Sequence, residues 1–180
     1  MKRLLVFAIF LMIQFHATAK WSPPENPDKN DAQSVIREAF ADTRAGRYEE
    51  SLAKHLWYHN HALEIDRALV GSRLAPALID WYELAKAYPP AMVKLKETRD
   101  DAIQQVIGGK KYAVKAFQDF SSINEHLEEE SQTVDVFVRL DKDSPELAGR
   151  TYAFAQEPLI KTKSIGFAVR TFGPKKPITA

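Results

Sequence analysis

The sequence contains no cysteine and only seven glycines. Without cysteine the chain can form no disulfide framework, and a lipid-anchored start after the N-terminal segment is excluded. The glycines form no phosphate-binding loop, because the segment GGKK at 108–111 lacks the Walker spacing and is typical of a turn. No serine lies in a nucleophile elbow, and no acidic residues are paired in a catalytic pattern. The sequence therefore predicts a protein that is not an enzyme and has no cofactor.

The sequence also lacks an excess of either charge. The chain has 25 Lys and Arg residues against 24 Asp and Glu residues. Without Lys2 and Arg3, which belong to the N-terminal segment, 23 basic residues face 24 acidic ones, a net charge of −1. Because affinity for nucleic acids depends largely on neutralising phosphates, this balance argues against a dedicated nucleic-acid binder.

The N-terminal segment, residues 1–19, has the pattern of a secretory signal peptide. Lys2 and Arg3 precede an apolar run from Leu4 to Phe15, and Ala17-Thr18-Ala19 supplies a small-x-small cleavage pattern. An uncleaved membrane anchor is the alternative, but the run of about 12 residues is shorter than the ~20 needed to span a bilayer. We expect cleavage after Ala19 and a periplasmic or secreted bacterial protein with no stable membrane span.

The mature chain is predicted to be all-α. A proline-rich leader at 20–31 is expected to be disordered, although Trp21 could instead fold back onto the domain, and residues 173–180 are expected to form a loose tail. Residues 32–172 between them are predicted to form about seven helices in antiparallel hairpins. Asp31 is expected to cap the first helix, and residues 67–72 to form a loop. The helices are expected at 33–44, 48–65, 74–88, 90–107, 111–127, 129–140 and from 145 through 155, where Pro158 breaks or kinks the last one.

The third of these helices has the clearest pattern. An apolar stripe at steps of three or four residues marks one face; it consists of Leu74, Leu78, Trp81, Ala85 and Tyr88. Pro76 indicates that the helix either starts or bends there. Pro89-Pro90 ends the helix, since neither proline has an N–H to donate, and Pro90 can begin the next one. The unit is therefore a helix hairpin with a very short turn.

Two segments fit both helix and strand. Val134, Val136, Val138 and Leu140 alternate as in a strand, whereas Val134, Phe137 and Val138 fit a helical stripe. Helical neighbours favour a helix at 133–140. Residues 164–172 remain open between the two, and this apolar segment is expected to pack over the last hairpin or to meet a partner.

The pattern W-x-x-L-A-x-x-Y at 81–88 is echoed 36 residues later by F-x-x-F-S-x-x-N at 117–124. A second pattern, with Ala39 followed by Gly46-x-Tyr48 and Ser51, marks the turn of the first hairpin. With these residues the chain resembles the tetratricopeptide-repeat family over most of 32–157, although its first hairpin is about ten residues longer than the family's usual 34-residue period. The resemblance implies an irregular α-α superhelix, a solenoid of stacked hairpins.

In the resembled family, peptides lie along the concave surface formed by the first helix of each hairpin. By position, this implies a partner-binding surface made of Gln33, Ile36, Phe40, Ile79, Tyr82, Lys86, Lys115 and Gln118. Tyr82 and Phe40 are the strongest candidates, because aromatic residues dominate such interfaces. Ordinary packing is the alternative for Phe40.

The histidines of the segment HLWYHNH at 55–61 offer a second hypothesis. His55 and His59 are four residues apart, so both imidazoles lie on one helical face, a spacing that can chelate a transition metal. No glutamate follows His55 as a zincin pattern requires, and buried histidines hydrogen-bonded across the hairpin are the alternative.

The sequence analysis thus predicts an exported, non-catalytic scaffold or adaptor of the bacterial cell envelope that binds an unidentified protein or peptide. Its two alternatives are a metal-binding protein that uses His55 and His59, and a protein that binds an apolar small ligand between hairpins, where the many aromatic residues could line a pocket.

Overall fold

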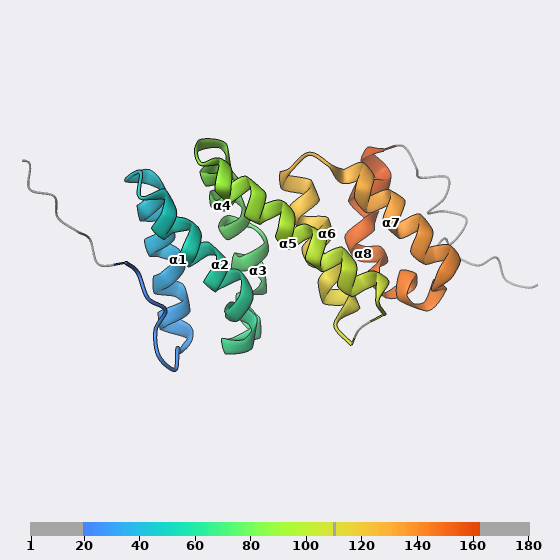
Figure 1. Ribbon diagram of the computed structural model, residues 1–180. Helices are drawn as coiled ribbons and strands as arrows, with labels where there is room; N and C mark the ends of the chain where they lie inside the picture. Colours follow the sequence, from blue (N-terminus) through green and yellow to red (C-terminus); the bar gives the residue numbers. More distant parts are fainter. Residues whose placement is uncertain (1–19, 110, 163–180) are drawn as a thin grey trace, which may run out of the picture.

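The computed structural model describes residues 20–109 and 111–162. The elements are α1 (Lys29–Arg44), α2 (Tyr48–Ile65), η1 (Arg67–Leu69), α3 (Val70–Leu74), α4 (Pro76–Ala87), α5 (Pro89–Ile107), α6 (Ala113–His126), α7 (Glu130–Asp143) and α8 (Pro145–Lys161). They extend from α1 and α2 at one end of an elongated molecule to α7 and α8 at the other (Figure 1). The described part contains no strand, so the all-α prediction is confirmed there, including a helix at 133–140. The expectations for 1–19, 164–172 and 173–180 lie outside the described residues.

Each helix pair packs against its neighbour along the chain. α1 packs on α2, α4 on α5 and α6 on α7, and the second helix of each pair also packs on the first helix of the next, α2 on α4, α5 on α6 and α7 on α8. The first helices touch as well, since α4 contacts both α1 and α6, and α6 contacts α8. Gly46 has a φ of +74°, which favours glycine, and it lies in the turn between α1 and α2 as predicted.

The first helix starts earlier than predicted. Asp28, not Asp31, is the N-cap: its Oδ1 accepts hydrogen bonds from the backbone N–H groups of Asn30 and Asp31, at 2.7 and 3.0 Å. The Asp31 carboxylate accepts in return from the N–H of Asp28 at 2.9 Å, which completes a capping box. The leader also makes a contact with the helices, because the Trp21 ring meets Trp57 edge to face with ring centroids 6.3 Å apart.

The loop predicted at 67–72 is wrong. Asp66 accepts a hydrogen bond from the N–H of Ala68 at 2.8 Å and so starts η1, and α3 follows directly. Gly71 does not interrupt the helical backbone, because Leu69 and Arg73 on either side of it are buried and hold the segment against the domain. Pro76 is the first residue of α4, which decides between the predicted start and bend.

The prolines after α4 act nearly as predicted, with a shift of one residue. Tyr88 is extended between α4 and α5, as expected for a residue before proline, and α5 begins at Pro89 rather than Pro90. Ser144 and Pro145 begin α8, although the Ser144 side chain makes no capping hydrogen bond.

Of the break or kink predicted at Pro158, the break does not occur, because α8 continues to Lys161. A proline inside a helix cannot donate a hydrogen bond to the carbonyl four residues earlier, here that of Phe154. The Ser121 hydroxyl on α6 donates to this Phe154 carbonyl at 2.8 Å. A side chain from a neighbouring helix therefore satisfies the acceptor that Pro158 leaves open.

Substitution of Ser121 by alanine is expected to lower the free energy of unfolding by about 1–3 kcal/mol, because the Phe154 carbonyl would lose its donor in a mostly buried position. In a Pro158→Ala background, residue 158 supplies an N–H to this carbonyl. There, Ser121→Ala should lower the free energy of unfolding clearly less. Urea unfolding of the two single variants and the double variant measures the coupling. Equal costs in both backgrounds would show that the hydroxyl does not compensate for the proline.

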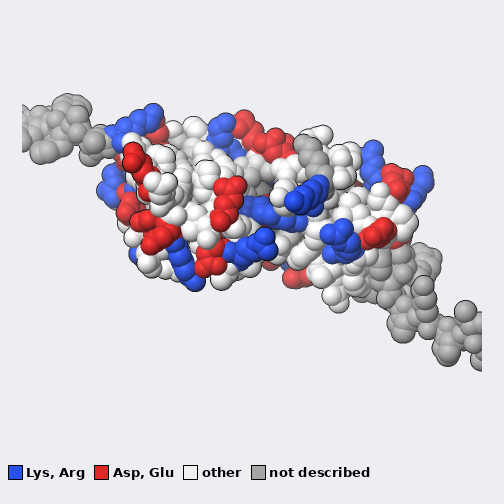
Figure 2. Space-filling model, turned by 90° about the horizontal axis from the view of Figure 1, so that it is seen from below, with Lys and Arg blue, Asp and Glu red and all other residues white. Residues whose placement is uncertain are grey.

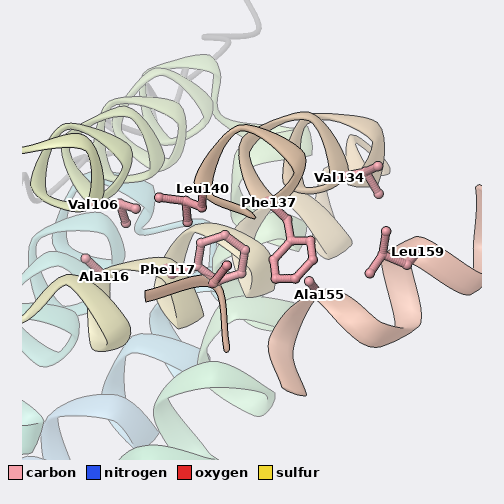
Figure 3. Close-up of a cluster of buried hydrophobic side chains, with 9 residues drawn as sticks. Val106, Ala116, Phe117, Val134, Phe137, Leu140, Ala155 and Leu159 are labelled. Carbon is pink, nitrogen blue, oxygen red and sulfur yellow. The ribbon is translucent and has the colours of Figure 1, made fainter. Parts of the chain in front are cut away.

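Within residues 20–109 and 111–162, the hydrophobic core consists of three clusters. Of the predicted stripe on α4, Leu78, Trp81 and Ala85 are buried, whereas Leu74 and Tyr88 are half-buried. The Trp81 indole donates to the Ala91 carbonyl at 3.2 Å and so ties α4 to α5. Figure 3 shows the cluster shared by α5, α6, α7 and α8, in which the rings of Phe117 and Phe137 meet with centroids 6.3 Å apart. None of the helices in the described ranges is long and apolar enough to cross a membrane.

Candidate functional site

The predicted partner-binding residues on α1 and α4 divide between the core and the surface. Ile36 is buried, and Phe40 is half-buried with its ring centroid 6.1 Å from that of His55, so both pack against the core. Ile79 is 51% exposed, and Tyr82, one turn further along α4, is half-buried.

The Tyr82 ring belongs to a small group of interacting side chains. The Lys86 Nζ lies 5.1 Å from its ring centroid, a cation–π distance, and donates a hydrogen bond to Glu83 Oε1 at 2.6 Å. Ile79, Tyr82, Glu83 and Lys86 lie within two turns of one helix, and we call them the α4 patch.

The two candidates on α6 lie elsewhere. Lys115 faces a cleft that it shares with His59 and Arg73, whereas Gln118 faces a different cleft between α6 and α8. The structure therefore keeps the predicted α4 residues together and places Lys115 and Gln118 in two separate clefts. Gln33 is half-buried on α1.

His55 is 1% exposed, and its imidazole contacts two residues of α4. Its Nε2–H donates to the Asp80 carboxylate on α4 at 3.0 Å, and its ring stacks on that of Trp81 with centroids 5.9 Å apart. The same Asp80 oxygen accepts from the Thr43 hydroxyl on α1 at 2.9 Å. His55 and Asp80 therefore connect α2 to α4, and Thr43 brings in α1.

His59 is also buried, and it points to a different partner. Its ring meets the edge of Trp81, and its Nε2 accepts a hydrogen bond from Arg73 Nη2 at 2.8 Å. Burial, and then the positive charge of Arg73, lower the pKa of His59 to about 3. The ring is therefore neutral near pH 7, with its proton on Nδ1.

The two histidines thus hydrogen-bond across to neighbouring helices, as in the alternative that the spacing left open. In the parts of the chain that the structure describes, no group of three or more His, Cys, Asp or Glu side chains is placed to hold a metal ion. The Nε2 atom of His55 makes a hydrogen bond with Asp80, and the Nε2 atom of His59 makes one with Arg73.

Arg73 and Asp119 form a buried ion pair that sequence analysis did not find. Arg73 is 2% exposed, and its Nη1 and Nη2 donate to the two oxygens of Asp119 at 2.5 and 2.9 Å. Its Nε donates to the His59 carbonyl at 2.7 Å, and Lys115 donates to Asp119 at 3.0 Å. The pair joins α3 to α6 across 46 residues of sequence, so no local spacing could reveal it.

Two clefts border α2. The first, of about 730 Å³, is lined by Trp21, Tyr48, Leu52, Ala53 and Tyr88 among others. The second, of about 390 Å³, lies over the Arg73–Asp119 pair, and its other walls come mainly from α2 and α5. Leu56 lines both clefts.

On the face shown in Figure 2, acidic and basic side chains of the described residues are interspersed, with no large patch of one charge. Comparison with protein-family models, with curated proteins and with solved structures found no match.

Proposed function

We propose that the mature chain is an exported, non-catalytic, tetratricopeptide-like adaptor that binds a protein partner in the bacterial cell envelope. The observation that carries this proposal is the α4 patch, where the large apolar side chain of Ile79 is half exposed beside the aromatic ring of Tyr82. Exposed apolar and aromatic side chains of this kind are typical of interaction surfaces.

The packing of the helices supports a solenoid of stacked hairpins. In such an array each hairpin buries one face on its own partner helix and another on the next hairpin. Here α2 packs on α4, α5 on α6 and α7 on α8, while the first helices α1, α4, α6 and α8 touch in sequence. The α4 patch therefore belongs to the middle of a row of first helices, the row that the family resemblance predicts for peptide binding.

The chemistry of the patch indicates the kind of partner segment. Ile79 and the Tyr82 ring supply apolar area, and Glu83 and Lys86 place one negative and one positive group beside it. We propose a segment with one apolar anchor side chain and polar flanks, because an anchor buried at the centre with a polar rim is the usual arrangement in protein interfaces. Export is supported by the signal-peptide pattern at 1–19.

Retention of a partner from envelope extract by the mature chain, residues 20–180, tests the proposal. Ile79→Ser and Tyr82→Ala are each expected to weaken binding of the retained protein about tenfold or more. Ile107→Ser is the matched control, because Ile107 is 55% exposed at the far end of α5 and should keep full binding.

The thermal midpoint of each variant has to be measured beside binding, because the Tyr82 ring also packs against the core. A partner lost only in the two α4 variants, at unchanged folding, supports the adaptor. Equal retention by all four proteins would remove the α4 patch from the interface.

A further inference from the structure

We propose that the cleft between α6 and α8 binds a segment of this same chain, residues 163–170, which directly follow α8 and its last turn. We call it the α6–α8 cleft, and we call residues 163–180 the C-terminal segment. The cleft lies on two of the first helices but apart from the α4 patch. This inference therefore goes beyond the proposed adaptor function and does not depend on it.

Two helices form the long walls of the α6–α8 cleft. The lining residues on each helix recur at spacings of three, four and seven residues, so they share one helical face. They are Gln118, Ser121, Ser122 and Glu125 on α6, and Ala153, Phe154, Glu157, Pro158 and Lys161 on α8. Glu130, the first residue of α7, also lines the cleft. Because Lys161 is the last residue of α8, the chain leaves this helix at the edge of the cleft.

The size of the cleft favours side chains of a passing segment over a small-molecule ligand. Its volume is about 180 Å³, below the roughly 300–1,000 Å³ of small-molecule sites. Ala153, Pro158 and the half-buried Phe154 supply apolar wall. The cleft therefore has room for one or two apolar side chains.

The charge of the cleft favours a basic occupant. Three glutamates line it together with a single lysine, which leaves the lining with a net charge of −2. The Lys161 Nζ donates to Glu130 at 3.1 Å and lies 3.4 Å from the Glu157 carboxylate. Glu125 is exposed, and its carboxylate makes no ion pair with any residue that the structure describes. An occupant with positive charge relieves this excess of carboxylates.

The C-terminal segment has the matching composition. It carries four basic residues and no acidic one. The basic residues are Lys163, Arg170, Lys175 and Lys176. Residues 20–162 have the opposite balance, with 19 Lys and Arg residues against 24 Asp and Glu residues. Ile165, Phe167 and Val169 are apolar at every second position, so in an extended chain they lie on one side.

The segment is also long enough to reach along the cleft. The α8 wall from Lys161 back to Ala153 covers eight residues, about 12 Å of helix. An extended chain covers that length in about four residues. After a reversal of two residues, 165–168 lie along the cleft, where Ile165 and Phe167 supply the apolar anchors. A basic residue on either side of them then lies near the carboxylates.

Cysteine pairs test this contact, because the chain has no cysteine of its own. In the mature chain, residues 20–180, Ala153→Cys on the cleft wall is combined with Ala168→Cys in the C-terminal segment. We expect a disulfide within one chain to form about tenfold faster than in a matched pair, Gln156→Cys with Ala168→Cys. Gln156 is exposed on α8 but does not line the cleft, so a segment that does not bind would reach both positions equally. Mass spectrometry after timed quenching in a thiol–disulfide buffer measures both rates.

Two further substitutions test the charge and the anchor. Glu125→Lys removes the excess of carboxylates, and Phe167→Ser removes the larger anchor. Each is expected to slow the Ala153→Cys/Ala168→Cys disulfide about threefold or more. Glu146→Lys is the matched control for charge, because Glu146 is exposed on α8 outside the cleft and should leave the rate unchanged. The thermal midpoint of each variant shows whether the helices remain folded.

The proposal is overturned if both cysteine pairs close at the same rate. It is also overturned if Glu125→Lys and Phe167→Ser leave the rate unchanged at intact folding. Disulfides that form only between two chains overturn it as well, since the cleft then receives the C-terminal segment of a second copy. The α4 patch is tested by retention of a partner, so failure of this proposal can be told from failure of the adaptor.

Discussion

Replacement of Asp119 by alanine is expected to lower the free energy of unfolding by about 3–5 kcal/mol. The substitution leaves the Arg73 guanidinium, which is 2% exposed, without its carboxylate partner, and a buried unpaired charge is far more costly than a lost surface pair. Burial alone would raise the pKa of Asp119, but the hydrogen bonds and charge of Arg73 keep this pKa below its usual value. Asp119 is therefore ionised near neutral pH. Urea unfolding monitored by circular dichroism measures the change.

The matched control removes a carboxylate from an exposed pair. Glu83→Ala breaks the Lys86–Glu83 pair, in which both side chains are about half exposed, and is expected to change the stability by less than about 1 kcal/mol. A double variant, Arg73→Met with Asp119→Leu, replaces the buried pair by apolar side chains. Its loss in the free energy of unfolding should be clearly smaller than the sum of the losses in Arg73→Met and Asp119→Leu measured singly. A loss of under 1 kcal/mol in Asp119→Ala would mean that the pair is not buried in solution.

The second large effect is a loss of stability on acidification through His59. The folded-state pKa of His59 is about 3, below its ordinary value near 6.5, so between these values the unfolded chain binds one more proton than the folded chain. Stability from this group is fully present above about pH 6.5 and falls with decreasing pH down to about 3. One proton corresponds to a slope of up to about 1.4 kcal/mol per pH unit, on the order of 4 kcal/mol across the window.

His59→Gln is expected to flatten this slope, because glutamine offers Arg73 a neutral acceptor that does not titrate. Urea unfolding at a series of pH values from 7 to 4 measures it. The groups that face His59 are Arg73 on α3, Asp119 and Lys115 on α6 and His55 on its own helix, so these residues stay unchanged in the comparison. His61→Gln removes an exposed imidazole from the same helix and should keep the slope. An identical slope in His59→Gln would rule out His59 as its source.

The spacing of His55 and His59 predicts one feature of the structure and leaves another undetermined. Four-residue spacing correctly predicts that both rings lie on one face of α2, because this follows from helix geometry alone. Whether that face holds a metal, a partner or a core depends on what packs against it. The Trp81 ring contacts both imidazoles, which hydrogen-bond to different partners, Asp80 for His55 and Arg73 for His59. Neither partner could be assigned from the sequence pattern.

The prolines likewise separate what the local sequence predicts from what depends on a distant residue. Pro76 begins α4, one of the two predicted alternatives, and Pro89 begins α5 one residue before the predicted start, because a missing N–H and a restricted φ act locally. Pro158 was expected to act locally in the same way, but it lies inside α8. The Ser121 hydroxyl, 37 residues earlier in the chain, donates to the Phe154 carbonyl that Pro158 leaves without a donor. A local rule fails where a distant residue supplies the missing hydrogen bond.

By itself, the sequence determined the all-α class, the order of the long helices and the buried face of α4, because helical periodicity and proline act over a few residues. Only the tertiary structure decided the helical course of 67–74, the Arg73–Asp119 pair and the two clefts beside α2. The ion pair joins residues 46 positions apart, and one cleft brings together Trp21 and Tyr88, 67 positions apart. Their formation depends on which helix faces meet, and periodicity within one helix carries no information about its partner.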